Sequence, residues 1–288
     1  MQTILLQTPV VGEKAEWTIS QKDPIMLVGS CFVDAIGQRL EHSGWDVCCN
    51  PFGVMYNPFS IADCLQRCMD RKPLEPSALV ERDGLWHSWY HHGSFSRRDR
   101  DDCLETCNVS VEKGYDALQK SHVLVVTFGT AYVFELKENK SVVANCHKVP
   151  ARYFERYRLS VEAIVERWKF LFENLRQLNP QLKVIFTVSP IRHLADTAHG
   201  NQLSKSVLLL STEQLCGERS DYFPAYEIVL DELRDYRYYD RDMVHPNDLA
   251  ADIVWNRFQQ YYMTLETQQQ AAEAYKAFRA SQHRPINI

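Results

Sequence analysis

The sequence lacks any long apolar run. Its uninterrupted hydrophobic stretches are short, such as Val123–Val126 and Val207–Leu210, whereas a helix needs about 20 apolar residues to cross a bilayer. We therefore expect no membrane-spanning segment and no membrane partner. The first residues also lack a basic stretch followed by a sustained hydrophobic segment, so we expect no signal peptide and a cytoplasmic protein.

A strong excess of one charge is also missing. The chain has 32 Lys and Arg residues against 37 Asp and Glu, a net charge of -5. This balance argues against a surface dedicated to nucleic acid. The 288 residues contain no repeat and no flexible linker, so we expect a single domain over residues 1–288, with a helical tail from about residue 265.

Cysteine pairs with metal-binding spacing are absent as well. The nine cysteines are scattered, and none forms a C-x-x-C motif. Most are expected to be buried thiols in a reducing compartment. The histidines of the segment 87–92 have no spacing on a regular element that favours a metal ion. The sequence therefore predicts neither a metal nor a cofactor.

Short β-rich runs alternate with helical patterns along the chain. Ile25–Gly29 predicts a buried strand, followed by a helix over 31–43 and a strand over 45–48, which implies a parallel crossover. Val123–Phe128 is the strongest strand candidate, and Lys183–Val188 predicts another. This alternation favours an α/β three-layer sandwich with a central parallel sheet of the flavodoxin-like type.

The remaining pattern is mostly helical. An edge strand is predicted at 17–19 and a hairpin turn at Asp83-Gly84. Pro246 suits the first turn of the last helix before the tail. Further helices are expected over residues 60–71, 103–120, 158–178, 202–216, 225–234, 246–264 and 268–280.

A Ser-Cys pair and a distant Asp-x-x-His together predict an acyl-transfer site. Ser30 and Cys31 follow the first strand and open a helix, where N–H groups stabilise a thiolate or an oxyanion. Asp242 and His245 offer an imidazole base and its orienting carboxylate. The structural alternative is that Ser30 caps the helix and Cys31 is a packed thiol.

The segment Gly29-Ser30-Cys31-Phe32-Val33 resembles the Gly-Ser-Cys-Phe-Ala signature of the GSCFA family, with valine in place of alanine. The resemblance extends over about residues 20–260, through the segments 50–53, 127–130, 189–193 and 238–245. That family is similar to the SGNH/GDSL hydrolases, which are esterases and O-acyltransferases. The resemblance implies a hydrolase of carboxylic esters that forms an acyl-enzyme, with a small-molecule or carbohydrate ester, such as an O-acetyl sugar, as its partner.

The same resemblance assigns roles to individual residues. A gapless match to Gly-Asp-Ser places the nucleophile at Cys31, whereas a match by residue type places it at Ser30, so both stay candidates, with a slight preference for Cys31. Asp242 and His245 correspond to the Asp and His that the superfamily carries in the last loop before its final helix.

An oxyanion hole needs donors aimed at the developing negative charge. The resemblance implies the N–H groups of the nucleophile and of Gly53. In the third block, Ala131 stands where the superfamily has a donor asparagine, and Thr130, Asn57 or Tyr132 are candidates to replace it.

Substrate-binding candidates lie in two loops. Arg192 and His193 follow a predicted strand, and Arg192 could bind an acidic group or form a salt bridge with Asp196 or Glu213. His92 adjoins an aromatic segment, 86–90, that could line a sugar or acyl cleft or simply pack in the interior.

Three other functions stay open at this point. One is O-acyl transfer to a sugar hydroxyl, which differs from hydrolysis only in excluding water from the acceptor site. Another is a non-catalytic binding module with a degraded site, supported by Ala131. The third is a redox-sensing thiol at Cys31. If Ser30 or Cys31 lies within hydrogen-bond reach of His245, the enzyme is favoured. If they are separated by more than the length of one water molecule, the binding module is favoured.

Overall fold

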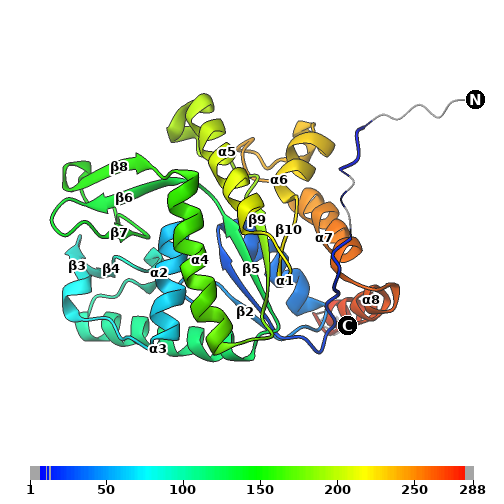
Figure 1. Cartoon of the computed structure of the whole chain (residues 1–288), viewed down its shortest axis with the longest axis horizontal. Coiled ribbons are helices and arrows are strands. Elements are labelled where there is room, and N and C mark those ends of the chain that lie inside the picture. Colours follow the sequence, from blue (N-terminus) through cyan, green and yellow to red (C-terminus); the bar gives the residue numbers. More distant parts are fainter. Residues whose placement is uncertain (1–6, 11, 13, 283–288) are drawn as a thin grey trace, which may run out of the picture.

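The computed structural model describes residues 7–10, 12 and 14–282. Five parallel strands form its central sheet in the spatial order β10-β9-β5-β1-β2 (Figure 1). Numbered in chain order, the five strands have the 2-1-3-4-5 order of flavodoxin-like sheets. The strand order changes direction between β1 and β5, although all five strands are parallel. The strands are β1 (Ile25–Gly29), β2 (Val47–Cys49), β5 (Val123–Phe128), β9 (Lys183–Val188) and β10 (Ser220–Tyr222).

Each face of the sheet contributes to its own hydrophobic core, because alternate residues of a strand point to opposite faces. In β1, Met26 and Val28 belong to one core, whereas Ile25 and Leu27 belong to the other. Helices cover both faces, which confirms the α/β fold. The first core lies under α2 (Pro58–Met69), α3 (Arg100–Lys120), α4 (Val161–Leu178) and α5 (Thr197–Leu215). The second lies under α1 (Cys31–His42), α6 (Ala225–Glu227), the adjoining π-helical turn Ile228–Glu232, α7 (Asp248–Tyr262) and α8 (Leu265–Gln282).

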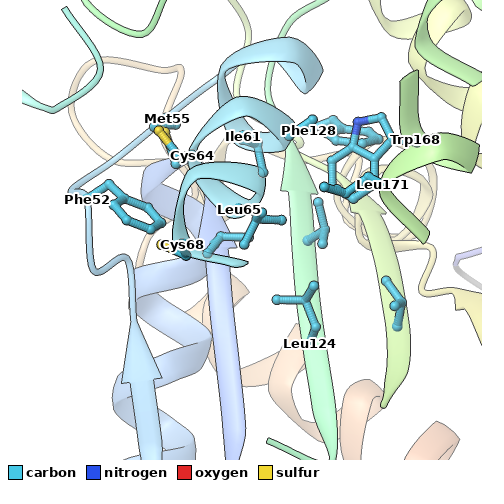
Figure 2. Packing of buried hydrophobic residues seen from close by; sticks show 14 of the residues in the cluster. Phe52, Met55, Ile61, Cys64, Leu65, Cys68, Leu124, Phe128, Trp168 and Leu171 are labelled. Carbon is cyan, nitrogen blue, oxygen red and sulfur yellow. The ribbon is translucent and has the colours of Figure 1, made fainter. Parts of the chain in front are cut away.

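Trp168 of α4 is the largest fully buried side chain of the first core. Its ring lies 5.1 Å from that of Phe128 and 5.3 Å from that of Phe186, and its indole N–H donates to the carbonyl of Pro58 at 3.1 Å. Figure 2 shows it beside Phe128, with Ile61 and Leu65 of α2 nearby. The apolar surface of this large side chain is therefore packed against other rings, and its one polar atom has a hydrogen-bond partner.

Two small β elements extend from the central sheet. The hairpin of β3 (Leu79–Arg82) and β4 (Leu85–Ser88) turns at Asp83 and Gly84, as predicted. Both turn residues have positive φ, +52° and +76°, as in the type I′ turns that suit hairpins.

The second small sheet was not predicted. It has the order β7-β6-β8 and is formed by β6 (Tyr132–Leu136), β7 (Val142–Val143) and β8 (Phe154–Arg158), seen beyond the end of α4 in Figure 1. Its strands carry many charged side chains, and in β8 only Phe154 is buried. A sheet with one solvated face and short strands gives a weak hydrophobic pattern, which explains why the sequence did not reveal it.

Other predicted boundaries need correction. Residues 17–19 form no strand; Ile19 instead donates its N–H to Tyr262 at 2.8 Å. Helix α4 starts at Val161 because Ser160 caps it, accepting the N–H of Ala163. Helix α7 starts at Asp248, so Pro246 precedes the helix and pairs with Tyr239 in an isolated β-bridge. None of the helices in the described residues is long and apolar enough to cross a membrane.

A buried histidine joins α3 to the β4 segment. His91 is fully buried, with Nδ1 2.8 Å from the hydroxyl of Ser88 and Nε2 2.8 Å from that of Ser110. The hydroxyl of Ser110 in turn donates to the Cys107 carbonyl at 2.7 Å. Burial lowers the pKa of His91 to about 3, with smaller contributions from Arg67 and His147. His91 is therefore neutral in the folded protein at neutral pH.

This neutral histidine makes the fold sensitive to acid. The unfolded chain binds a proton at His91 below about pH 6.5, whereas the folded protein resists protonation until about pH 3. Stability is therefore full above pH 6.5 and falls as the pH drops, by roughly 3 kcal/mol at pH 4 from this group. Urea unfolding of the wild type and His91→Asn at pH 7 and pH 4 tests this. The variant should lose less stability on acidification, and equal losses would contradict the assignment.

Candidate active site

The end of β1 is a sharp turn that only glycine fits. Gly29 has φ +140°, and a Cβ at this position would lie 2.2 Å from the carbonyl oxygen of Thr127 on β5. The Gly29 N–H donates to Oδ1 of Asn50 at 2.9 Å, and its carbonyl accepts the N–H of Met55 at 2.9 Å. The chain therefore leaves the sheet at the point where the strand order reverses, with Ser30 as N-cap of α1.

The two candidate nucleophiles differ in accessibility. Ser30 is 1% exposed, and its buried hydroxyl has no hydrogen-bond partner among the described residues. Cys31, the first residue of α1, is partly exposed. Burial is the main influence on the Cys31 thiol and raises its pKa, as does Asp34, whereas the N–H groups of Cys31 and Phe32 and the charge of Lys205 lower it. A substrate can therefore reach Cys31 more readily than Ser30.

Asp34 connects α1 to the loop after β2. Its Oδ1 accepts the side-chain N–H of Asn50 at 2.7 Å and the thiol of Cys49 at 3.4 Å. Since Asn50 also binds the N–H of Gly29, these side chains fix the turn that presents Cys31. The sequence analysis overlooked Asp34, although its position three residues after Cys31 on a helix places it close to that thiol.

Asp242 and His245 form a hydrogen-bonded pair in the loop before α7. Nδ1 of His245 lies 2.6 Å from Oδ2 of Asp242. Oδ1 of Asp242 accepts the N–H groups of Val244 at 2.9 Å and His245 at 3.0 Å. The bonds from the two backbone N–H groups, and then the bond to the imidazole, lower the pKa of Asp242 to about 2. Both side chains are about half exposed, at 50% and 47%, so Nε2 of the oriented imidazole stays available.

Two rings, those of Tyr56 and His193, are influenced by the two halves of the predicted site. Within the described part of the chain, no hydrogen bond joins His245 to Ser30 or Cys31. Tyr56 and His193 stand edge to face, with ring centroids 5.7 Å apart. Burial and the charge of Cys31 raise the pKa of Tyr56, and the charge of His245 is among the influences on His193. Cys31 is thus close enough to Tyr56, and His245 to His193, for their charges to influence these rings.

Gly53 and Asn57 each already have hydrogen-bond partners. Gly53, at φ +75°, donates its N–H to the carbonyl of Asn50 at 2.8 Å. Asn57 caps α2, with Oδ1 accepting the N–H of Ser60 at 2.8 Å and Nδ2 donating to its hydroxyl at 2.9 Å. Their role in an oxyanion hole stays a prediction.

Thr130 is similarly engaged. Its N–H donates to the carbonyl of Tyr56 at 3.0 Å, and its hydroxyl lies 3.1 Å from that of Ser204 and accepts the N–H of Tyr132. By contrast, the N–H groups of Cys31 and Phe32 open a helix and have no carbonyl partner within it. They are the donors nearest to the thiol.

The substrate-binding candidates are found in different places. Asp196, a predicted alternative partner of Arg192, pairs with Arg156. Arg192 lines an exposed hollow of about 250 Å³ that includes Tyr236 and Tyr239. Burial, and then the charge of Lys205, lower the pKa of His193 to about 4.

His92 lies apart from this hollow. Its Nδ1 accepts the N–H of Ser94 at 3.2 Å. A Cβ added to Gly53 would lie 2.4 Å from the Cβ of His92. The neighbouring Trp89 packs against Phe154, with ring centroids 5.8 Å apart. No group of three or more His, Cys, Asp or Glu side chains in the described ranges is arranged to hold a metal ion.

The central parallel sheet with helices on both faces defines an α/β protein. Its Gly-Ser-Cys turn lies at the point where the strand order changes direction. The model of the GSCFA family matches residues 24–258. The chain therefore belongs to the GSCFA family. Comparison with curated proteins gives no match.

Solved structures similar to this chain include three carbohydrate esterases. The family 3 enzyme from Talaromyces cellulolyticus is 10% identical over 87% of this chain and 99% of its own, with a TM-score of 0.39. The family 3 enzyme from Clostridium thermocellum is 10% identical over 88% and 98%, with a TM-score of 0.38. The acetyl xylan esterase from the rumen bacterium Butyrivibrio proteoclasticus is 10% identical over 88% and 64%, with a TM-score of 0.38.

The close approach at Gly29 predicts a large effect of a single methyl group. Gly29→Ala should lower the free energy of unfolding by more than about 3 kcal/mol, because backbone atoms of Thr127 must move. Gly93→Ala is the matched control, since a Cβ there meets nothing within 4 Å. Denaturant unfolding measures both variants. A Gly29→Ala protein as stable as Gly93→Ala would show that the turn is not as tight as described.

Proposed function

We propose that this protein hydrolyses carboxylic esters through an acyl-enzyme on Cys31. The observation that carries the proposal is the Asp242–His245 pair, in which one carboxylate binds the imidazole and two N–H groups of its own loop. A carboxylate held in this way fixes the tautomer and direction of a general base. The partly exposed thiol at the start of α1 supplies a nucleophile at the opposite side of the same sheet edge.

The first half-reaction forms a thioester. His245 accepts the thiol proton, and the sulfur of Cys31 attacks the ester carbonyl carbon, forming an S–C bond. The negative charge on the carbonyl oxygen is stabilised by the N–H groups of Cys31 and Phe32 at the helix N-terminus. When the C–O bond breaks, the leaving alcohol takes the proton from His245.

Water completes the cycle. His245 removes a proton from water, whose oxygen attacks the thioester carbon. The C–S bond then breaks, the carboxylic acid leaves, and Cys31 regains its proton. Catalytic hydrogen bonds often tighten only when substrate is bound. Because no hydrogen bond joins His245 to Ser30 or Cys31 among the described residues, the exposed loop of His245 must approach Cys31 when the ester binds. A chain whose loop does not approach would be the non-catalytic binding module.

The hollow at Arg192 supports an acidic sugar ester as the substrate class. Arg192 and Arg234 line it together with Tyr236 and Tyr239, whose rings are 5.8 Å apart. The carboxylate of Asp235, at its edge, is already bonded to Arg237. Tyr239 also pairs with Pro246, next to His245. Guanidinium groups bind carboxylates, and aromatic faces suit sugar rings.

Hydrolysis of p-nitrophenyl acetate near neutral pH tests the catalytic assignment. Cys31→Ala and His245→Ala should lose at least about 100-fold in kcat/KM because nucleophile and base are removed. Asp242→Asn should lose at least about tenfold, and Ser30→Ala less than about threefold.

The control is Cys146→Ala, which removes another partly exposed thiol and should leave the rate unchanged. If Ser30→Ala is inactive and Cys31→Ala is active, the nucleophile is Ser30. Acetylated Cys31 that accumulates without turnover, detected by mass spectrometry, would favour transfer to an acceptor hydroxyl over hydrolysis. A wild type no faster than His245→Ala would contradict the esterase.

The acidic-substrate assignment predicts a selective effect on KM. The double variant Arg192→Gln, Arg234→Gln should raise KM for an acetylated uronic acid at least about tenfold, with little change for the matching neutral sugar. Arg98→Gln, another exposed arginine, is the control. Equal KM changes for both sugars would contradict a role for these guanidinium groups in recognising the acid.

A further inference from the structure

A fully buried lysine lies at the same sheet edge as the candidate nucleophile. Lys205 of α5 is 0% exposed. Its ammonium nitrogen donates to the carbonyl oxygens of Gly129 at 2.6 Å and Ser189 at 2.7 Å. These two carbonyls follow β5 and β9, at the sheet edge where β1 ends at Gly29, two residues before Cys31. Burying an ammonium group costs free energy, so a buried lysine at this edge calls for an explanation.

Lys205 belongs to a polar strip along the buried face of α5. Asn201 accepts the N–H of His193 at 3.1 Å. Ser204 accepts the N–H of Ala131 at 2.8 Å and contacts the hydroxyl of Thr130. With Lys205, these side chains hold the loops that follow β5 and β9, so the ammonium is fixed at this sheet edge.

The groups around Lys205 define its charge balance. Burial lowers its pKa to about 7, whereas Asp196 and Cys31 act in the opposite direction. Asp196 already pairs with Arg156, so its charge is largely compensated. His193, with its pKa near 4, is neutral at pH 6 and above. Of the two acidic groups that raise the pKa of Lys205, Cys31 is therefore the one without an ion-pair partner among the described residues.

We propose that Lys205 is an electrostatic positioning residue, which supplies a fixed positive charge for the anionic form of Cys31 and for the oxyanion formed there. Ala131 offers no side-chain donor, and the N–H groups of Gly53 and Thr130 are engaged with carbonyls. A charge fixed by two backbone carbonyls needs no reorganisation when negative charge develops, which is the condition for electrostatic stabilisation. This inference rests on the proposed function only in taking Cys31 as the nucleophile.

The charge of Lys205 predicts a pH-dependent reactivity of Cys31. Below about pH 7 the lysine is protonated and favours the thiolate. Above that pH it loses its proton, and its influence fades. The ratio of the wild-type alkylation rate to that of a neutral variant should therefore be about tenfold at pH 6, equivalent to one pKa unit, and should approach one at pH 9.

Alkylation by iodoacetamide, followed for the Cys31 peptide by mass spectrometry, measures this ratio without any ester. Lys205→Met removes the charge and the donors, whereas Lys205→Gln removes the charge and keeps an N–H donor. Both should show the pH-dependent ratio, and the control Lys169→Met, exposed on α4, should not. If Lys205→Gln matches the wild type at pH 6, or if the ratio is the same at pH 6 and pH 9, the electrostatic role is wrong.

A second measurement keeps the wild-type lysine, in case the variants fail to fold. Cys31 is alkylated with iodoacetate, which adds a negative charge, or with iodoacetamide, which adds none. The titration of Lys205 is then followed by NMR of protein with ¹³C-labelled lysine. The carboxymethyl adduct should shift the Lys205 midpoint upward by at least about half a pH unit. Equal midpoints would overturn the proposal, whether or not the protein hydrolyses esters.

Discussion

The close approach of Gly29 to the Thr127 carbonyl governs the geometry of the whole site. Because the position has no room for a side chain, the chain can leave β1 with a positive φ and enter α1 at once. This turn buries the hydroxyl of Ser30 and leaves the thiol of Cys31 partly exposed. The choice between two adjacent candidate nucleophiles is thus a consequence of backbone packing between β1 and β5.

Carboxylates fix both segments of the candidate site. Asp34 binds Asn50, which in turn binds the backbone of Gly29, and Asp242 binds both the backbone and the side chain of His245. Asp242 accepts two backbone N–H groups of its loop, whereas Asp34 accepts the amide N–H of Asn50 and the thiol of Cys49. In each case one carboxylate binds more than one donor, so the direction of its partners is determined.

Local patterns predicted three of the five central strands with their bounds, whereas β2 lies at Val47–Cys49 instead of 45–48 and β10 was not predicted. The strands Ile25–Gly29, Val123–Phe128 and Lys183–Val188 have the predicted bounds, because continuous apolar runs are typical of buried parallel strands. The Asp83-Gly84 turn was equally predictable from its residues. The β6–β8 sheet was not, since its strands alternate weakly and depend on pairing between distant segments.

The candidate site was only partly readable from the sequence. The Asp-x-x-His spacing places both side chains in one short loop, so their contact is a local property. Lys205 carries no local signal, because its burial depends on the ends of two strands that lie far away in the sequence. The same holds for Asp34, whose partner Asn50 comes from another element. Tertiary contacts of this kind have no counterpart in residue spacing.

The β6–β8 sheet has a small hydrophobic cluster of its own, formed by Leu136, Val143 and Phe154. It lies in the sequence between β5 and α4, immediately after the Gly129-Thr130 loop, and Arg156 of β8 forms an ion pair with Asp196. Because this sheet is hydrogen-bonded separately from the central one, insertions or deletions in it can change the surface next to the Gly129-Thr130 loop without changing the register of the central strands.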